Sequence, residues 1–153
     1  AYQESFAAHT LALLGLERAS EVRDDLLFLQ EFYGWMTQSG AHWPQTFFDW
    51  FAGTASAERA AASPQAGLYE SDGFAKVRSL MDAKSPVRPE RLEHAYFQAE
   101  RPVDLIVETV ESFWDPIADE DNWAPLEAHL DWSEQARLAY DWPEALERTQ
   151  RKT

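Results

Sequence analysis

The chain has 153 residues, the size of one ordinary domain, and no cysteine, which excludes disulfides, thiolate metal sites and thiol catalysis. Its 27 Asp and Glu residues against 13 Lys and Arg give a formal net charge of −14, which argues against nucleic acids and anionic membranes as partners. No run approaches the ~20 apolar residues of a membrane span and no signal peptide opens the sequence, so we expect a cytoplasmic protein.

Helical periodicity predicts a first helix over residues 2 to 14. Phe6, His9 and Leu13 have the spacing of one helical face, and Gly15 is a typical residue for the helix end. We therefore expect these three side chains to face the core, with His9 at its edge.

A second helix is predicted from Ser20, as its N-cap, to about residue 38, with Gly40 at its end. Its apolar residues surround most of the helix, which indicates burial on more than one side. The helix should be central in the domain or should also face a partner. These apolar residues are Leu26, Leu27, Phe28, Leu29, Phe32, Tyr33, Trp35 and Met36.

Pro44 is expected to begin a short helix that Gly53 ends. Five large aromatic residues fall within nine positions here, more than one helix face can bury. This aromatic cluster is either part of the core or a surface that contacts a missing neighbour. Its members are Trp43, Phe47, Phe48, Trp50 and Phe51.

The middle of the chain is predicted to alternate between helices and breaks. Residues 56–62 are rich in alanine and should be helical, residues 63–67 form a break, and residues 72–83 form the next helix. Residues 84–101 contain two prolines and are expected to be an irregular connector. The side chains expected to face inward from the 72–83 helix are Phe74, Val77, Leu80 and Met81.

Pro102 is predicted to open the clearest helix of the chain. One apolar stripe runs along it, formed by Val103, Ile106, Val110, Phe113 or Trp114, and Ile117. The β-branched residues at its start could also indicate a strand, but the acidic residues among them share one helical face and favour a helix.

Those acidic residues are Asp104, Glu108, Glu111 and Asp115. No Lys or Arg stands four residues on to relieve their repulsion, and residues 119–121 extend them. Three interpretations stay open for this acidic stripe: a solvated face, a docking face for a basic surface, or a site for a hard cation such as Mg²⁺.

The C-terminal part repeats an Asn or Asp followed by Trp, at 122–123, 131–132 and 141–142. Glu134 and Glu144 stand three residues after Asp131 and Asp141, which is the spacing of a capping box. Each of these Asp residues is therefore predicted to begin a short helix. We expect an all-α fold, an irregular bundle of about six to eight helices in a single compact domain over residues 1–147. Residues 148–153 should form a polar tail.

The sequence holds no compact catalytic motif. It lacks a phosphate-binding glycine loop, a nucleophile elbow, a kinase catalytic loop and a histidine pair at metal-binding spacing. His42, His94 and His129, like His9, are interpreted as structural or surface residues. We therefore assign no catalytic, cofactor-binding or metal-binding residue to this chain. A small enzyme that uses a pair of carboxylates remains possible, since 27 acidic residues make any pair uninformative.

Residues in four parts of the sequence are spaced as they are in a known protein family. The first is made of Tyr2, Phe6, Leu14, Gly15, Leu16, Asp25, Phe28, Leu29, Met36, His42, Trp43, Thr46 and Phe47; the others are residues 47–53, 95–98 and 108–118. The first resembles the region just after the kinase-like core in the SelO (YdiU, selenoprotein O) family of pseudokinases, and the other three resemble a divergent bacterial branch of that family.

Members of that family are protein adenylyltransferases that transfer AMP from ATP to protein hydroxyls with a divalent metal. The resemblance implies that this chain is the helical C-terminal domain of such a protein, and that it braces the kinase-like core or shapes substrate access. ATP and Mg²⁺ would then bind only in the upstream core, which would be the partner of this domain. The alternative is a free-standing helical module that binds another protein through the acidic stripe or the aromatic cluster.

Either function requires apolar surface that the chain does not cover by itself. We expect this surface near residues 26–36 or 43–51. If both regions are covered within the chain, the interpretation as a fragment loses its main physical support.

Overall fold

The computed structural model describes residues 2–141, and the regular structure of these residues is helical throughout. The prediction of an all-α domain with several short helices is confirmed. The α-helices are α1 (Tyr2–Leu13), α2 (Val22–Ser39), α3 (Trp43–Asp49), α4 (Ala57–Ala61), α5 (Ala66–Tyr69), α6 (Asp72–Asp82), α7 (Val107–Glu120) and α8 (Ala124–Tyr140). Three 3₁₀ helices join them, η1 (Gly53–Ser56), η2 (Pro89–Glu93) and η3 (Ala95–Gln98).

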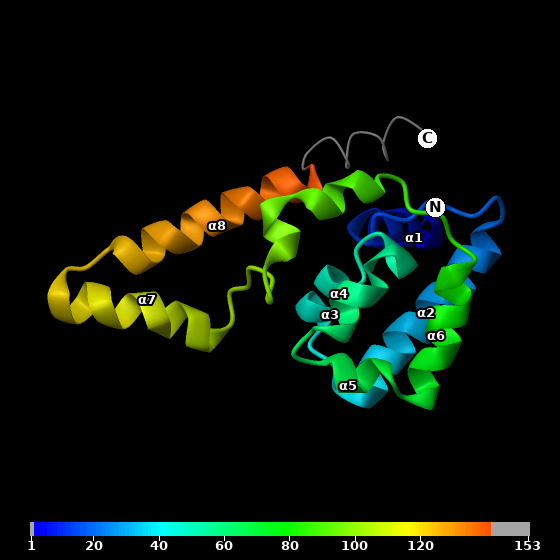
Figure 1. Ribbon diagram of the computed structural model, residues 1–153, viewed down its shortest axis with the longest axis horizontal. Helices are drawn as coiled ribbons and strands as arrows, with labels where there is room; N and C mark the ends of the chain where they lie inside the picture. The colour runs from blue at the N-terminus through cyan, green and yellow to red at the C-terminus, as the bar shows by residue number, and fades with distance from the viewer. Residues whose placement is uncertain (1, 142–153) are drawn as a thin grey trace.

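Helix α2 lies at the centre of the body of the molecule, between α1 and α6 (Figure 1). This confirms the central position predicted for the second helix. Its buried side chains meet those of the neighbouring helices in one apolar core. The fully buried large residues of this core include Leu11, Leu14, Phe28, Leu29, Phe32, Met36, Trp50, Phe74 and Met81.

The face that α1 buries differs from the predicted one. Ala7, Leu11 and Leu14 are buried, whereas Phe6 and His9 are exposed. The inward face of α1 combines small and large side chains, Ala7 and Ala8 with Leu11, and packs on α2 in the first core. Phe6 instead packs on Tyr33 at the rim, with the ring centroids 5.5 Å apart.

Of the two predicted ends of α2, the N-cap at Ser20 is wrong and the C-terminal Gly40 is correct. Glu21 holds the N-cap position and makes no capping bond from its side chain. The preceding loop is held from inside the helix, because Asp25 accepts a hydrogen bond from the backbone N–H of Ala19 at 2.9 Å. Gly40 ends the helix with φ +69°, the left-handed conformation expected of a C-terminal glycine.

The predicted helix at 72–83 is confirmed as α6. Ser71 caps it by accepting a hydrogen bond from the backbone N–H of Phe74 at 3.3 Å, and Phe74, Val77 and Met81 are buried as expected. The predicted helix at 56–62 is confirmed as α4, which spans Ala57–Ala61. Within the predicted break, helix α5 begins at Ala66.

A second core joins α3 to the end of α8. Phe48, Phe51 and Ala52 meet Tyr96, Phe97, Ala136 and Ala139 there. Residues 84–101, predicted to be an irregular connector, contain the 3₁₀ helices η2 and η3, and their Tyr96 and Phe97 are fully buried.

The end of the described chain differs most from the sequence prediction. Residues 102–106 are not helical, so the helix predicted from Pro102 begins five residues later, at Val107. Helix α8 runs without interruption through 131–132, where a new short helix was predicted. Asp141 follows its last residue with φ +61°, and residues 142–153, including Trp142, Glu144 and the predicted tail, lie outside the described residues.

Candidate interaction surface

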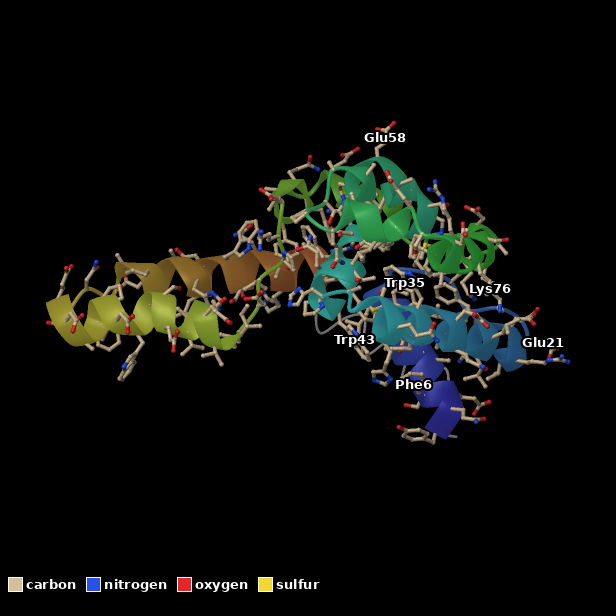
Figure 2. All side chains as sticks on the ribbon, turned by 90° about the horizontal axis from the view of Figure 1, so that it is seen from below. Phe6, Glu21, Trp35, Trp43, Glu58 and Lys76 are labelled. Atoms are coloured by element: carbon tan, nitrogen blue, oxygen red, sulfur yellow. The ribbon has the colours of Figure 1, made fainter. Side chains whose placement is uncertain are left out.

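Helices α7 and α8 form an antiparallel hairpin that extends away from the body of the molecule (Figures 1 and 2). The hairpin joins the body through the second half of α8. Ala136 and Ala139 are buried in the second core, and the rings of Trp132 and Tyr140 pack on Tyr96 with centroids 5.0 and 5.8 Å away. Helix α7 has no buried residue along its whole length.

Short polar side chains fix both ends of α7. Asp104 accepts a hydrogen bond from the hydroxyl of Thr109 at 2.7 Å, which holds the chain extended before the helix begins. Asp121 ends the helix with φ +51°, a conformation that Asp and Asn adopt more readily than most residues. Asn122 then accepts a hydrogen bond from the backbone N–H of Ala124 at 3.2 Å, so the chain reverses directly into α8.

Few side chains hold the two helices of the hairpin together. The ring of Phe113 packs on the imidazole of His129 with centroids 5.4 Å apart. Phe113, Ile117 and Leu126 are half-buried. Of the two residues that the sequence left open, Phe113 faces α8 and Trp114 faces solvent.

A run of large apolar side chains lies exposed at the start of the hairpin. The exposed fractions are 72% for Leu105, 43% for Ile106, 68% for Val107, 40% for Val110 and 60% for Trp114. We call these five residues the apolar band. Val107, Val110 and Trp114 lie on one face of α7, since they are three and seven residues apart. Ile106 and Val110 belong to the predicted apolar stripe, and the structure shows both exposed.

The acidic stripe runs beside the apolar band. Glu108, Glu111 and Asp115 are exposed and have the same spacing as Val107, Val110 and Trp114, one residue further along the helix. One residue is a rotation of about 100°, so the acidic and apolar faces are neighbours on α7. The structure brings three of the four predicted acidic residues together; Asp104 precedes the helix and bonds to Thr109.

The negative charge of the chain is concentrated here. Residues 102–136 contain ten Asp and Glu residues and no Lys or Arg. The other 17 acidic residues share the rest of the chain with all 13 basic residues. The hairpin therefore carries a strong negative field, while the body is close to balanced.

The aromatic cluster lies mostly in the interior. Phe48, Trp50 and Phe51 are buried and Phe47 is half-buried, packed edge-on against Phe32. Trp43 is the exposed member and lies on the same side of the body as Phe6 (Figure 2). The predicted apolar surface is therefore covered at 47–51 and on most of 26–36, with Trp43 and Leu27 exposed, so the interpretation of the chain as a fragment loses the physical support expected there. The larger exposed set lies at 105–114.

A buried polar network lies next to the aromatic cluster. The carboxylate of Asp49 accepts hydrogen bonds from Gln45 at 2.8 Å, from the hydroxyl of Tyr69 at 2.7 Å and from the hydroxyl of Ser63. Burial, together with the bond to Asp49, raises the pKa of Tyr69 above its ordinary value. These three hydrogen bonds tie α3 to the segment around α5 through the Asp49 carboxylate.

Arg59 borders the same region and closes the second core from outside. Its guanidinium donates to the carbonyl oxygens of Phe97, at 2.9 Å, and Phe48, and lies over both rings. Burial lowers the pKa of Arg59. A cavity of about 260 Å³ adjoins it, lined by residues that include Asp49, Ser63 and Phe97.

The four histidines lie apart and make local contacts. His9 is exposed and bonds to the carbonyl oxygen of Ser5, and His94 accepts a hydrogen bond from the backbone N–H of Tyr96. Within residues 2–141, no three His, Asp or Glu side chains converge as they would around a metal ion. None of the helices described there combines the length and apolarity that a bilayer crossing needs.

Ile106 and Val110 stand in the predicted apolar stripe, but the exposure of this part of the surface was not predicted from the sequence. A signal was present, because ten acidic residues without a basic one make a poor core helix, and the apolar residues among them are then left at the surface. No family model, no curated protein and no solved structure matches the chain. The resemblance to the SelO family therefore rests on its sequence pattern alone.

Proposed function

We propose that this chain is a helical protein-interaction domain. It docks through the apolar band and the acidic stripe of α7 onto an apolar, basic surface of another polypeptide. The observation that carries this proposal is that α7 buries none of its residues, although Val107, Val110 and Trp114 form an apolar face on it.

Energetics favours a covered state for this face. Fully burying one large apolar side chain contributes about 1.5 to 3 kcal/mol, and five such side chains lie within ten residues here. Helix α8 already supports α7 from one side, so a partner adds to a surface that is partly ordered before binding.

The charge of the hairpin selects the partner. Nucleic acids, anionic membranes and a second copy of this chain all bring further negative charge to ten acidic residues, and like charges repel. A surface rich in Lys and Arg is attracted by the same field and associates faster at low salt.

The SelO resemblance names one such polypeptide, the kinase-like core of the same protein. In that case the domain braces the core, and ATP and Mg²⁺ bind in the core. Helix α7 would be the part of this chain that packs on it. The sequence pattern supports this version, and the exposed apolar band is compatible with it.

Photo-crosslinking in the source cells tests the proposal. A photoreactive phenylalanine analogue at Val110 or at Trp114 should capture the same polypeptide, which is then purified and tested for direct binding. If the kinase-like core is the partner, the crosslinked peptide belongs to the core of the same protein.

Charge reversal provides the control for this experiment. The double variant E111K/D115K should bind the purified partner at least about tenfold more weakly. The double variant E58K/E70K makes the same change of charge at two exposed acids of the body and should bind as the wild type does. Equal losses in both variants, or different captured polypeptides at the two positions, would contradict docking through α7.

A further inference from the structure

We infer that the segment docking on α7 is a basic amphipathic helix that lies along the hairpin as a third helix. This inference rests on the proposed function and specifies the partner. It follows from what the α7 face offers to a partner, from the order of side chains around α7, and from the position of the acidic stripe.

The α7 face offers side chains only. The backbone N–H and C=O groups in the middle of a helix are bonded within that helix, so α7 has none to share with an extended segment. A segment that buries its own backbone against Val107, Val110 and Trp114 must satisfy its own hydrogen bonds. A helix does so, and its ridges fit between side chains three and four residues apart.

The order of side chains around α7 places the partner. Phe113 faces α8, Val110 and Trp114 follow around the helix, and the acidic stripe comes next. The apolar band therefore borders the groove between the two helices. A third helix that lies along this groove, at the usual axial separation of about 8 to 10 Å from α7, would contact the apolar band and lie near the exposed Leu130 of α8.

The length of α7 sets the length of the partner helix. Fourteen residues at 1.5 Å per residue span about 21 Å, which corresponds to a partner helix of about four turns. Glu108, Glu111 and Asp115 cover one flank of this span, so Lys or Arg at helical spacing along one edge of the partner's apolar stripe would pair with them.

A designed peptide provides a direct test on the whole chain. The probe is an 18-residue helix of Leu and Lys with one apolar face, and the comparison is the same design with Glu in place of Lys. We expect the Lys peptide to bind, with NMR shift changes confined to residues 105–121 and neighbouring parts of α8. Its affinity should fall about tenfold or more between 0.05 and 0.5 M NaCl.

Matched variants separate helix docking from general attraction to an acidic protein. W114A keeps the charge and should weaken binding at least about tenfold, whereas W123A, at another exposed tryptophan, should change it less than about twofold. E111K/D115K should weaken binding about tenfold or more, and E58K/E70K, on the body, should not. Far-ultraviolet circular dichroism checks that each variant keeps its helices.

Two results would overturn this inference. One is binding that responds equally to both charge pairs and ignores W114A, since that is nonspecific electrostatics. The other is a partner, captured at Val110 and Trp114, that contacts α7 through a segment without helical structure; the proposed function would then stand and the helical partner would be wrong. Self-association of the chain through α7, seen by sedimentation, would contradict both proposals.

Discussion

Asp25 shows how a single buried carboxylate joins distant parts of this chain. It has no exposed surface, yet it accepts hydrogen bonds from Lys84 at 2.6 Å, from the backbone of Ala19 at 2.9 Å and from Arg18 at 3.4 Å. Lys84 lies 59 residues away in sequence, so no local pattern could have predicted the pair. The sequence identified Asp25 only as part of the SelO resemblance.

Replacing Asp25 should therefore destabilise the fold strongly. D25A leaves the ammonium of Lys84, whose side chain is 7% exposed, without its carboxylate, and we expect a loss of about 3 to 5 kcal/mol in the free energy of unfolding. Urea denaturation measures it. The exposed neighbour Asp24 gives the control, with an expected loss of about 0.5 kcal/mol for D24A. Similar losses in the two variants would show that the buried pair has no special role.

The phenols of the two cores set an upper pH limit for the fold. Burial raises the pKa values of Tyr69, Tyr96 and Tyr140 above the ordinary value of 10.0. These phenols ionise near pH 10 in the unfolded chain but stay neutral at that pH in the folded chain. Their contribution to the free energy of unfolding is therefore fully present below pH 10 and is lost as the pH rises further. We expect the free energy of unfolding, measured in urea from pH 8 to 11.5, to fall above pH 10. Y140F should reduce that slope by up to about 1.4 kcal/mol per pH unit, and an unchanged slope would show that Tyr140 ionises freely in the fold.

At the scale of helices, local signals identified the elements and failed at their ends. Helix α6 was predicted almost to the residue because Ser71 caps it and its apolar residues share one face. The start of α7 was wrong because Asp104 bonds to Thr109 and holds the preceding residues extended, in spite of Pro102. Asp131 was wrongly predicted to begin a helix, because an exposed Asp inside a long helix costs little free energy. The proline in the first turn of α8 marks the true beginning of that helix.

Arg91 helps to attach α8 to the body, beside Arg88 and the second core. Arg91 donates to the carbonyl oxygens of Leu138 at 3.0 Å and Ala139 at 2.9 Å, and it pairs with Asp141 at 2.7 Å. R91A should leave the last carbonyl groups of α8 without this partner and cost about 1 to 3 kcal/mol. Hydrogen exchange should rise in residues 136–140, while α2 and α6 keep their protection. A uniform rise across the chain would mean that Arg91 supports the whole fold rather than this joint.

At the scale of the whole molecule, the surface was harder to predict than the core. The acidic stripe was correct for three of its four residues, because charge and spacing are visible in sequence. The exposed apolar surface was expected at 26–36 or 43–51, but Tyr96 and Phe97 cover part of the aromatic cluster, and α1 and α6 cover α2. Which apolar residues remain exposed depends on contacts between distant segments. Helical periodicity does not contain that information.

The hairpin should consequently be less stable than the body when the chain is alone. A helix of 14 residues is marginal in water, and α7 packs on α8 without burying any of its residues. We expect the amides in the middle of α7 to exchange at least about 100-fold faster than those of α2, whose Phe28, Phe32 and Met36 are fully buried. Native-state hydrogen exchange of the isolated chain measures both. Binding of the basic helix should slow exchange in α7 and leave α2 unchanged, since only α7 gains a covered face. Exchange in the free α7 as slow as in α2 would show that the hairpin is stable by itself, and the argument that its apolar face needs a partner would lose its physical basis.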